Sequence, residues 1–186
     1  MDQGLKMKTA LVVIDVQNDY FPNGKKELSG STEAVNNIRA VIGHCRAKGN
    51  AIIYIQHIAA KPDAPFFAAG TDGIAIHESI RPQEGDAIII KHFPNSFRET
   101  ALKEYLDENQ ITHLVFTGMM THMCVDTTVR AAFDLGYSNT LIADCCATLD
   151  LVHDNETVGA KDVQNAFLAA LNGTFCTLQT TREFLR

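Results

Sequence analysis

Short apolar runs of the β type alternate with helical patterns along the whole chain, and this alternation constrains the fold more than any other feature. It is the signature of βαβ units, in which helices join parallel strands. Most of the runs are almost entirely apolar, as expected for strands that helices cover on both faces. The sequence therefore predicts an α/β fold with six strands, at residues 9–15, 51–57, 87–91, 113–117, 140–143 and 174–178.

Helical spacing of apolar residues fills the connections between these strands. Ser29 or Ser31 is expected to cap the first helix and Gly49 to end it. The apolar positions of that helix are Val35, Ile38, Val41, Ile42 and Cys45. Further helices are predicted around residues 102–106, 125–135 and 162–172, with a short terminal helix at 180–186.

The length and charge of the chain narrow the class of protein. With 186 residues, 46% of them hydrophobic and 20% charged, the composition is that of a globular protein with one domain spanning residues 1–186. A net charge of -6, with no basic cluster longer than Lys25 and Lys26, argues against a nucleic-acid partner. Residues 1–8 lack a signal-peptide core, and no apolar run approaches the roughly 20 residues that span a bilayer. We therefore expect a cytoplasmic protein that does not bind membranes.

The five cysteines do not fall into the paired spacings of a disulfide or zinc framework. A reducing compartment fits this pattern best. Cys145 and Cys146 are adjacent and follow an apolar run, which predicts two small buried thiols rather than a vicinal disulfide or a redox switch.

Three chemically capable residues follow strands of the predicted sheet, where ligands of doubly wound folds bind. Asp15 and Lys91 each end an apolar strand, and because burying either charge alone is costly, the two are expected to pair. A purely structural salt bridge is the alternative interpretation. With Thr121 as a helix cap, Cys124 is expected in the first helical turn, where the helix dipole and Lys91 favour a thiolate. Asp15 can then accept the thiol proton.

Three segments of the chain resemble the signatures of the isochorismatase-like cysteine hydrolases, a group that includes nicotinamidases and N-carbamoylsarcosine amidohydrolases. Residues 15–21 read Asp-Val-Gln-Asn-Asp-Tyr-Phe, Lys91 ends the third strand, and residues 118–125 read Gly-Met-Met-Thr-His-Met-Cys-Val. The resemblance spans nearly the whole chain. It implies a three-layer Rossmann-like fold, with a six-stranded parallel sheet of order 3-2-1-4-5-6 and helices on both faces, and a catalytic triad of Asp15, Lys91 and Cys124.

The same resemblance implies a non-proline cis peptide between Met119 and Met120. Its expected use is to aim the backbone amides of Met120 and Cys124 into an oxyanion hole. In the implied strand order, the third strand lies two positions from the first, about 10 Å away. Lys91 must therefore lean inward to reach Asp15.

The expected substrate pocket is apolar and enclosed. The stretch around His57 lacks the Asp-x-His pair with which nicotinamidases bind a metal, so we expect neither a metal nor another cofactor. The long loop at residues 58–86 carries Phe66 and Phe67, which either cover the site as a lid or patch the core beneath the loop. The side chains expected to line the pocket are Gln17, Phe21, His57, Phe93 and Thr121.

A thiolate beside an oxyanion hole suits attack on a planar carbonyl. The sequence therefore favours a cysteine hydrolase that cleaves a C–N bond of a small amide or carbamoyl compound through a thioester-type intermediate. In one alternative, Asp15 protonates an isochorismate-like vinyl ether and Cys124 is incidental. In another, the protein is not catalytic and binds a metabolite or senses oxidation through its thiol. The resemblance also implies a homo-oligomer, a dimer or a tetramer.

Overall fold

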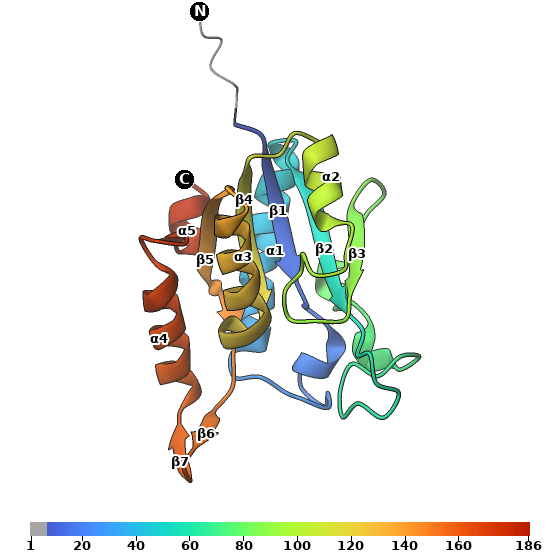
Figure 1. The fold of residues 1–186 in the computed structure, drawn as a ribbon, viewed down its shortest axis with the longest axis vertical. Coiled ribbons are helices and arrows are strands. Elements are labelled where there is room, and N and C mark those ends of the chain that lie inside the picture. The colour runs from blue at the N-terminus through green and yellow to red at the C-terminus, as the bar shows by residue number, and fades with distance from the viewer. Residues whose placement is uncertain (1–6) are drawn as a thin grey trace, which may run out of the picture.

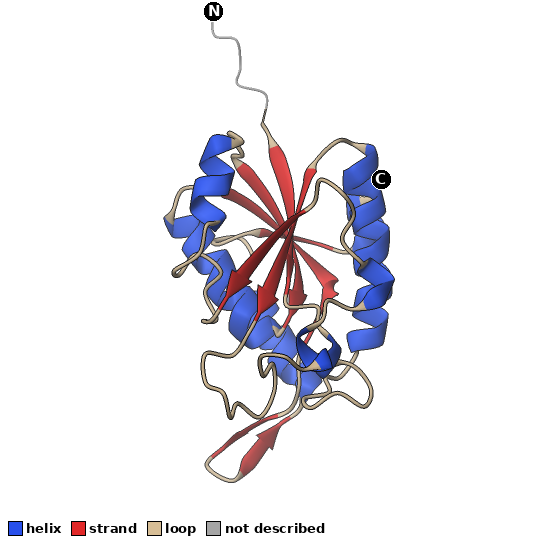
Figure 2. Cartoon of the chain, turned by 90° about the vertical axis from the view of Figure 1, so that its right-hand side faces the viewer, coloured by secondary structure: helices blue, strands red, loops and turns tan. Residues whose placement is uncertain are grey.

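The computed structural model describes residues 7–186 and contains a parallel sheet between two layers of helices (Figures 1 and 2). The strand order is β3-β2-β1-β4-β5-β8, with every neighbouring pair parallel. The predicted order 3-2-1-4-5-6 is confirmed, because β8 is the sixth strand of this sheet along the chain. The strands are β1 (Thr9–Ile14), β2 (Ala51–His57), β3 (Ala87–Lys91), β4 (His113–Met119), β5 (Ser138–Ala147) and β8 (Thr177–Gln179).

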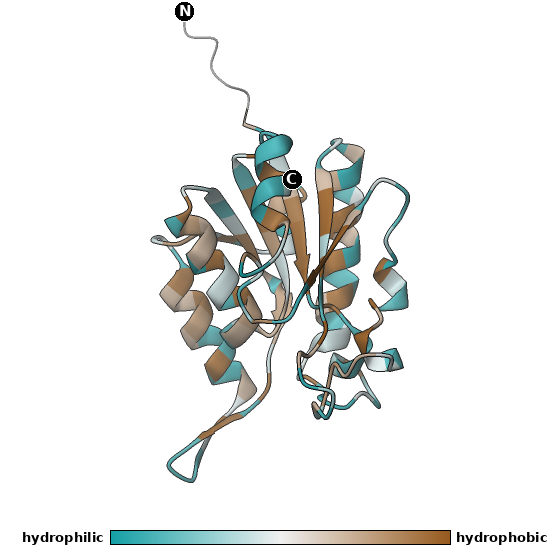
Figure 3. Ribbon diagram, turned by 45° about the vertical axis from the view of Figure 1, so that its right-hand side comes forward, coloured by the Kyte–Doolittle hydropathy of each residue, from teal (hydrophilic) through white to brown (hydrophobic). Residues whose placement is uncertain are grey.

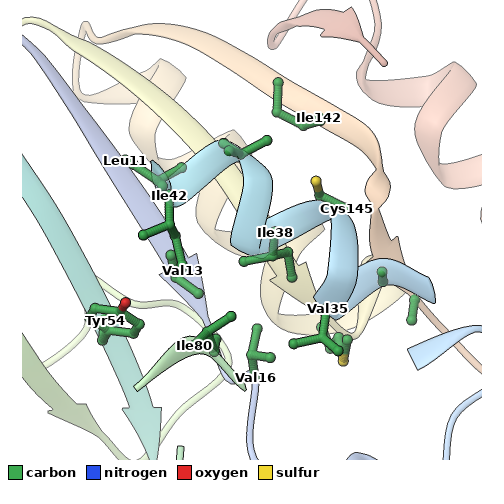
Figure 4. Close-up of a cluster of buried hydrophobic side chains, with 14 of the residues drawn as sticks. Leu11, Val13, Val16, Val35, Ile38, Ile42, Tyr54, Ile80, Ile142 and Cys145 are labelled. Atoms are coloured by element: carbon green, nitrogen blue, oxygen red, sulfur yellow. The ribbon is translucent and has the colours of Figure 1, made fainter. Parts of the chain in front are cut away.

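One face of the sheet is covered by helix α1 (Ser31–Ala47). Leu11 and Val13 of β1 point to this face and belong to the same buried cluster as Ile38 and Ile42 of α1, as Figure 4 shows. The terminal helix α5 (Thr181–Phe184) packs beside α1 and β5, close to its predicted position.

The opposite face is covered by three helices, α2 (Leu102–Glu108), α3 (Asp126–Asp134) and α4 (Ala160–Leu171). Val12 and Ile14 of β1, which alternate with the residues of the first face, pack with apolar side chains of these helices. Both faces of the central strands are therefore buried, and Figure 3 shows largely apolar strands between helices that mix apolar and polar residues. No helix within residues 7–186 is long and apolar enough to cross a membrane.

The sixth sheet strand begins later than the predicted range of 174–178. Gly173, at a φ of 84°, ends α4. The amides of Phe175 and Cys176 then donate to the carbonyl of Leu171, which keeps this stretch in a turn. The predicted serine cap of α1 is also wrong, because Gly30 occupies that position at a φ of 77° and no side chain caps the helix.

A hairpin that the sequence did not predict follows β5. Its strands β6 (Leu151–His153) and β7 (Glu156–Val158) are antiparallel and project from the end of the molecule at which the sheet strands finish (Figure 1). Val152 and Val158 are exposed on it. The hairpin therefore has no apolar face buried in the core, and its short strands carry little pattern in the sequence.

The two adjacent cysteines lie near the carboxyl end of β5 and face opposite sides of the sheet. Cys145 packs into the cluster under α1, whereas Cys146 packs into the cluster on the opposite face. Both are buried and free, which confirms the prediction of two small core thiols.

Candidate active site

Three side chains from three different strand ends meet at the carboxyl edge of the sheet. Asp15 directly follows β1, Lys91 is the last residue of β3, and Cys124 lies in a π-helical turn after β4. The Lys91 ammonium lies 2.7 Å from Oδ2 of Asp15 and 3.3 Å from Sγ of Cys124. All three residues are buried, with exposed fractions of 0%, 0% and 4%. The structure thus brings together the three residues singled out in the sequence.

Lys91 reaches Asp15 across the intervening strand β2. The register pairs Lys91 with His57 and Ile14 with Ile55, so β2 separates the two charged residues. Asp15 has a positive φ of 50°, a conformation that aspartate adopts more readily than most residues. Its amide still donates to the carbonyl of Ile55, at 3.0 Å, which fixes the residue beside β2.

The Lys91 ammonium has more acceptors around it than it has protons. Besides Asp15 and Cys124, it lies 2.8 Å from Nδ1 of His57 and 3.1 Å from the carbonyl oxygen of Phe93. An ammonium carries three N–H donors. The sulfur is the most distant of the four acceptors, so it competes with oxygen and nitrogen for a hydrogen bond from Lys91.

The expectation of a low pKa at Cys124 is wrong in direction. Burial raises the pKa of the Cys124 thiol well above its usual range, and the Asp15 carboxylate adds to that rise, whereas Lys91 lowers it. Burial likewise raises the pKa of the Asp15 carboxyl, and Lys91 offsets part of that effect. Burial lowers the pKa of the Lys91 ammonium, but Asp15 and Cys124 outweigh it and the net pKa is raised. The resting site therefore holds a neutral thiol beside a charged lysine.

The turn that carries Cys124 has an unusual hydrogen-bond pattern. The peptide bond between Met119 and Met120 is cis. The amides of Met123 and Val125 both donate to the carbonyl of Met120, at 3.0 and 3.2 Å, whereas the amide of Cys124 between them does not use that acceptor. The Met120 amide likewise donates to no backbone carbonyl in the described part of the chain.

Thr121 does not cap the following helix, contrary to the prediction. The residue is fully buried, and its hydroxyl lies 2.6 Å from Oε1 of Gln164 and 3.2 Å from the carbonyl of Ala147. Thr121 thereby ties the turn to α4 and β5, and it does not line the cavity beside Cys124.

Cys124 forms part of the wall of a cavity of about 390 Å³. Most of the surrounding side chains are aromatic or aliphatic, as in many small-molecule sites. His57, one of the five side chains expected in the pocket, lies in this wall. The lining residues are Tyr20, Lys26, His57, Phe66, Phe67, Pro94, Met120, His122, Met123, Cys124, Leu149 and Leu151.

The structure places the other expected pocket residues elsewhere. Gln17 is fully buried and holds the backbone of His57, accepting from its amide at 2.7 Å and donating to its carbonyl at 2.9 Å. Phe21 lines a separate cavity of about 490 Å³ and lies against His77, with ring centroids 4.0 Å apart. Phe93 contributes its carbonyl to Lys91, while the guanidinium of Arg98 covers its ring.

Both aromatic residues of the long loop line the Cys124 cavity, and one is also part of the core. Phe67 is 1% exposed and its amide donates to Oδ2 of Asp19 at 2.6 Å. Phe66 is partly buried and packs against Tyr20, with ring centroids 6.2 Å apart. Asp19 therefore fixes the loop through a side-chain to backbone bond.

Three lining residues carried no signal in the sequence. Lys26 follows a turn after the first motif, Leu149 lies just before the hairpin, and Leu151 is the first residue of the hairpin. None of them belongs to a periodic apolar pattern or a motif. Their place at the cavity depends on loop conformation, which local spacing does not encode.

A cluster of possible metal ligands coincides with the site, but its centre holds a cation of the chain itself. Asp15, His57 and Cys124 offer ligand atoms within 4.8 Å of one another. The Lys91 ammonium lies within 2.7, 2.8 and 3.3 Å of these same three side chains. Because the ammonium supplies the positive charge that these donors need, the cluster does not fit a resident metal ion.

Comparison with known proteins agrees with this architecture. The family model of the isochorismatase domain matches residues 9–183, and the chain belongs to the isochorismatase family of hydrolases. It is 46% identical to the uncharacterized isochorismatase family protein YddQ of Bacillus subtilis over 180 residues. The aligned residues cover 97% of this chain and 100% of that protein.

Two further similarities extend the comparison to a solved structure and to a protein of named activity. A crystal structure from Oleispira antarctica, assigned as an isochorismatase hydrolase, is 41% identical with a TM-score of 0.93 and covers 97% of each chain. The ureidoacrylate amidohydrolase RutB of Caulobacter segnis is 28% identical over 209 residues, which cover 95% of this chain and 84% of that protein.

Proposed function

We propose that the protein hydrolyses a C–N bond of a small amide or carbamoyl compound, with Cys124 as nucleophile, Asp15 as general base and Lys91 as their shared cation. The observation that carries this proposal is the Lys91 ammonium, which is buried and lies within 3.3 Å of both partners, beside a largely apolar cavity. The similarity to an amidohydrolase that acts on a ureido compound supports the choice of bond.

The first step is a proton transfer from the Cys124 thiol to Asp15. The thiol is neutral at rest, so a base within reach is required, and Oδ1 of Asp15 is buried without a hydrogen-bond partner in residues 7–186. The thiolate that forms lies beside Lys91, which stabilises it because charge interactions are strong in a buried site. Sγ then attacks the carbonyl carbon, and the C=O π electrons move to oxygen.

The amides of Met120 and Cys124 are suited to hold the oxyanion that forms. Both lie in the turn next to the nucleophile, and the helix that follows adds a favourable dipole. Removing one such donor typically costs about 100-fold or more in turnover.

The remaining steps return the enzyme to its resting state. Protonated Asp15 donates to the leaving nitrogen, the C–N bond breaks, and ammonia or an amine departs from a thioester-type intermediate. Asp15 then takes a proton from a water molecule while the oxygen of that water attacks the same carbon. The C–S bond breaks, the acid or carbamate is released, and the thiolate recovers its proton.

The two alternative functions account for less of the site. A vinyl ether hydrolase uses Asp15 as an acid and gives no role to the contact between Lys91 and Cys124. A redox-sensing thiol is expected to be exposed with a low pKa, whereas Cys124 is 4% exposed and its pKa is raised.

A substrate panel with matched variants tests the proposal. Native protein, Cys124→Ala and Cys124→Ser are incubated with primary amides, ureido compounds, carbamoyl compounds and isochorismate, and ammonia and pyruvate release are followed. We expect ammonia from at least one compound with native protein and a loss of about 1,000-fold or more in both variants. Pyruvate release that persists in Cys124→Ala would establish the vinyl ether reaction instead. Absence of any turnover with a folded protein would favour a binding protein.

We also propose that the protein works in a reducing compartment, as the cytoplasm is. All five cysteines are free and buried, and the reaction above needs one of them as a thiol. Mass analysis after alkylation of protein extracted from cells checks this. Five free thiols are expected, and an intact disulfide would contradict the proposal.

A further inference from the structure

We propose that Lys26 forms an anion-binding subsite in the Cys124 cavity, so that the substrate carries a carboxylate in addition to its amide or carbamoyl group. That the bound anion is a substrate rests on the proposed function, whereas the anion-binding subsite does not. The subsite is inferred from the position of Lys26 in the cavity wall and from the absence of acidic residues there.

Lys26 brings an unmatched positive charge to an otherwise apolar wall. None of the residues that line the cavity is an aspartate or a glutamate. Lys26 takes part in none of the ion pairs found between residues 7 and 186. Two histidines also line the cavity, His57 and His122, and burial lowers the pKa of each, so both are neutral near pH 7. Lys26 is therefore the charged group that a ligand meets.

The backbone of Lys26 is held in place rather than left on a free loop. Its amide donates to the carbonyl of Asp19 at 2.8 Å. Two residues later, the amide of Leu28 donates to the carbonyl of Tyr20 at 3.1 Å, and the Leu28 side chain is buried. These contacts anchor both sides of Lys26 to the segment that follows Asp15.

The ammonium lies over an aromatic ring of the same cavity. Lys26 Nζ is 4.9 Å from the centroid of the Phe66 ring. A ring face holds a cation without neutralising it. The charge therefore stays available to a carboxylate, and the apolar surroundings strengthen their attraction relative to open solvent.

The size of the cavity limits the rest of the ligand. A volume of about 390 Å³ lies at the lower end of the range for small-molecule pockets. Tyr20, Leu149 and Leu151 add apolar surface to the wall that also holds Lys26 and Cys124. The geometry suits a short aliphatic chain with a carboxylate and a primary amide or ureido group.

Matched substrate pairs test the subsite through turnover. The pairs are 3-ureidopropanoate with propylurea, and 6-amino-6-oxohexanoate with hexanamide, in which only the carboxylate differs. Native protein is expected to prefer the anionic member by about tenfold or more in kcat/KM, equivalent to one charge interaction. Lys26→Met is expected to remove the preference through KM, and Lys26→Arg to keep it. Preference that survives in Lys26→Met would overturn the proposal.

Lys25→Met is the matched control. It makes the same change in net charge, but Lys25 is exposed and lines the separate cavity of Phe21. The control is expected to keep the native preference. An equal loss in Lys25→Met and Lys26→Met would show a general effect of charge and would also overturn the proposal.

A binding measurement separates failure of the subsite from failure of the proposed function. Pentanoate, which has no amide, is titrated into Cys124→Ala with and without Lys26→Met, by calorimetry. Binding that weakens about tenfold without Lys26 supports the subsite, even if no amide in any panel is hydrolysed. Unchanged binding, or no measurable binding to Cys124→Ala, overturns the subsite, even if amide turnover is found.

Discussion

The Lys91 ammonium lies 2.8 Å from Nδ1 of His57 and donates a hydrogen bond to it. An ammonium has no acceptor, so Nδ1 is unprotonated and the ring proton of His57 resides on Nε2. Burial, with Lys91 and His92, lowers the pKa of His57 to about 4, which keeps the ring neutral. His57 is thus an uncharged partner of the cation that Asp15 and Cys124 share.

This relationship predicts a loss of stability in mild acid. The pKa of His57 is about 4 in the folded protein and about 6.5 in an unfolded chain, so the unfolded state binds the proton first as pH falls. The free energy of unfolding is therefore expected to decrease between pH 6.5 and 4 by up to about 3 kcal/mol from this group. Urea titrations across this range measure the slope. His57→Asn keeps an acceptor for Lys91 and is expected to remove the contribution of His57 to this slope.

The exposed His153 of the hairpin supplies the control for that slope. His153→Asn makes the same substitution at an exposed position, and its slope is measured beside that of His57→Asn. Equal slopes in native protein and His57→Asn would contradict the assignment of a neutral, buried His57.

Removing the buried cation is expected to destabilise the fold. Lys91→Met leaves the Asp15 carboxylate, 0% exposed, without its counter-ion, and breaking such a pair typically costs about 3–5 kcal/mol. Asp15→Asn in the same chain removes the stranded charge. The double variant is therefore expected to be more stable than the sum of the two single effects predicts. Guanidinium unfolding of the four proteins measures this coupling, and strict additivity would count against a direct ion pair.

A glycine before the Cys124 turn is required by close packing. Gly118 has a φ of 131°, and a Cβ there would collide with the backbone oxygen of Ile14. Gly118→Ala is expected to lower the free energy of unfolding by about 3 kcal/mol or more. Gly43, inside α1, has open space around a Cβ, so Gly43→Ala is expected to raise it by roughly 0.5–1 kcal/mol. Equal effects of the two substitutions in urea titrations would contradict the packing argument.

The activity is expected to fall in acid through Asp15. The base must be ionised to accept the thiol proton, and burial raises the pKa of its carboxyl. For an amide that the panel identifies, kcat/KM is expected to decline at a pH above the ordinary carboxyl pKa of about 4. Lys91→Met removes the charge that holds this pKa down, so the decline in any residual activity moves to higher pH. A decline that stays near pH 4 in both proteins would assign the base to an exposed carboxyl.

Strong local patterns made the sheet predictable from the sequence. Each central strand is an apolar run because both of its faces are buried, and Asp15 ends such a run abruptly. Lys91 ends the apolar run of the edge strand β3, where Ile88 and Ile90 are exposed, so one face of that strand is not covered as the sequence predicted. Short exposed elements lack this signal. The hairpin of β6 and β7 therefore escaped prediction, as did the start of β8, which a helix-ending turn delays.

The meeting of Asp15, Lys91 and Cys124 was predictable from the sequence, but most of the residues that line the cavity beside them were not. Asp15, Lys91 and Cys124 have chemical types and strand-end positions that stand out in the sequence. Lys26 and Leu151 reach the cavity through loops, and Thr121 found a partner in Gln164, 43 residues away, instead of capping its own helix. The raised pKa of Cys124 also escaped prediction, because burial depends on packing from the whole fold.

The most direct test of the account is to trap the acyl group on Cys124. Native protein is mixed with an amide from which it releases ammonia, quenched in acid within the first turnovers, and analysed by mass spectrometry of intact protein and of its peptides. If Cys124 is the nucleophile, the peptide that contains it is expected to gain the mass of the acyl or carbamoyl group, and hydroxylamine is expected to remove that mass. Ammonia release that continues in Cys124→Ala, or an adduct on one of the other four cysteines instead, would contradict this role of Cys124.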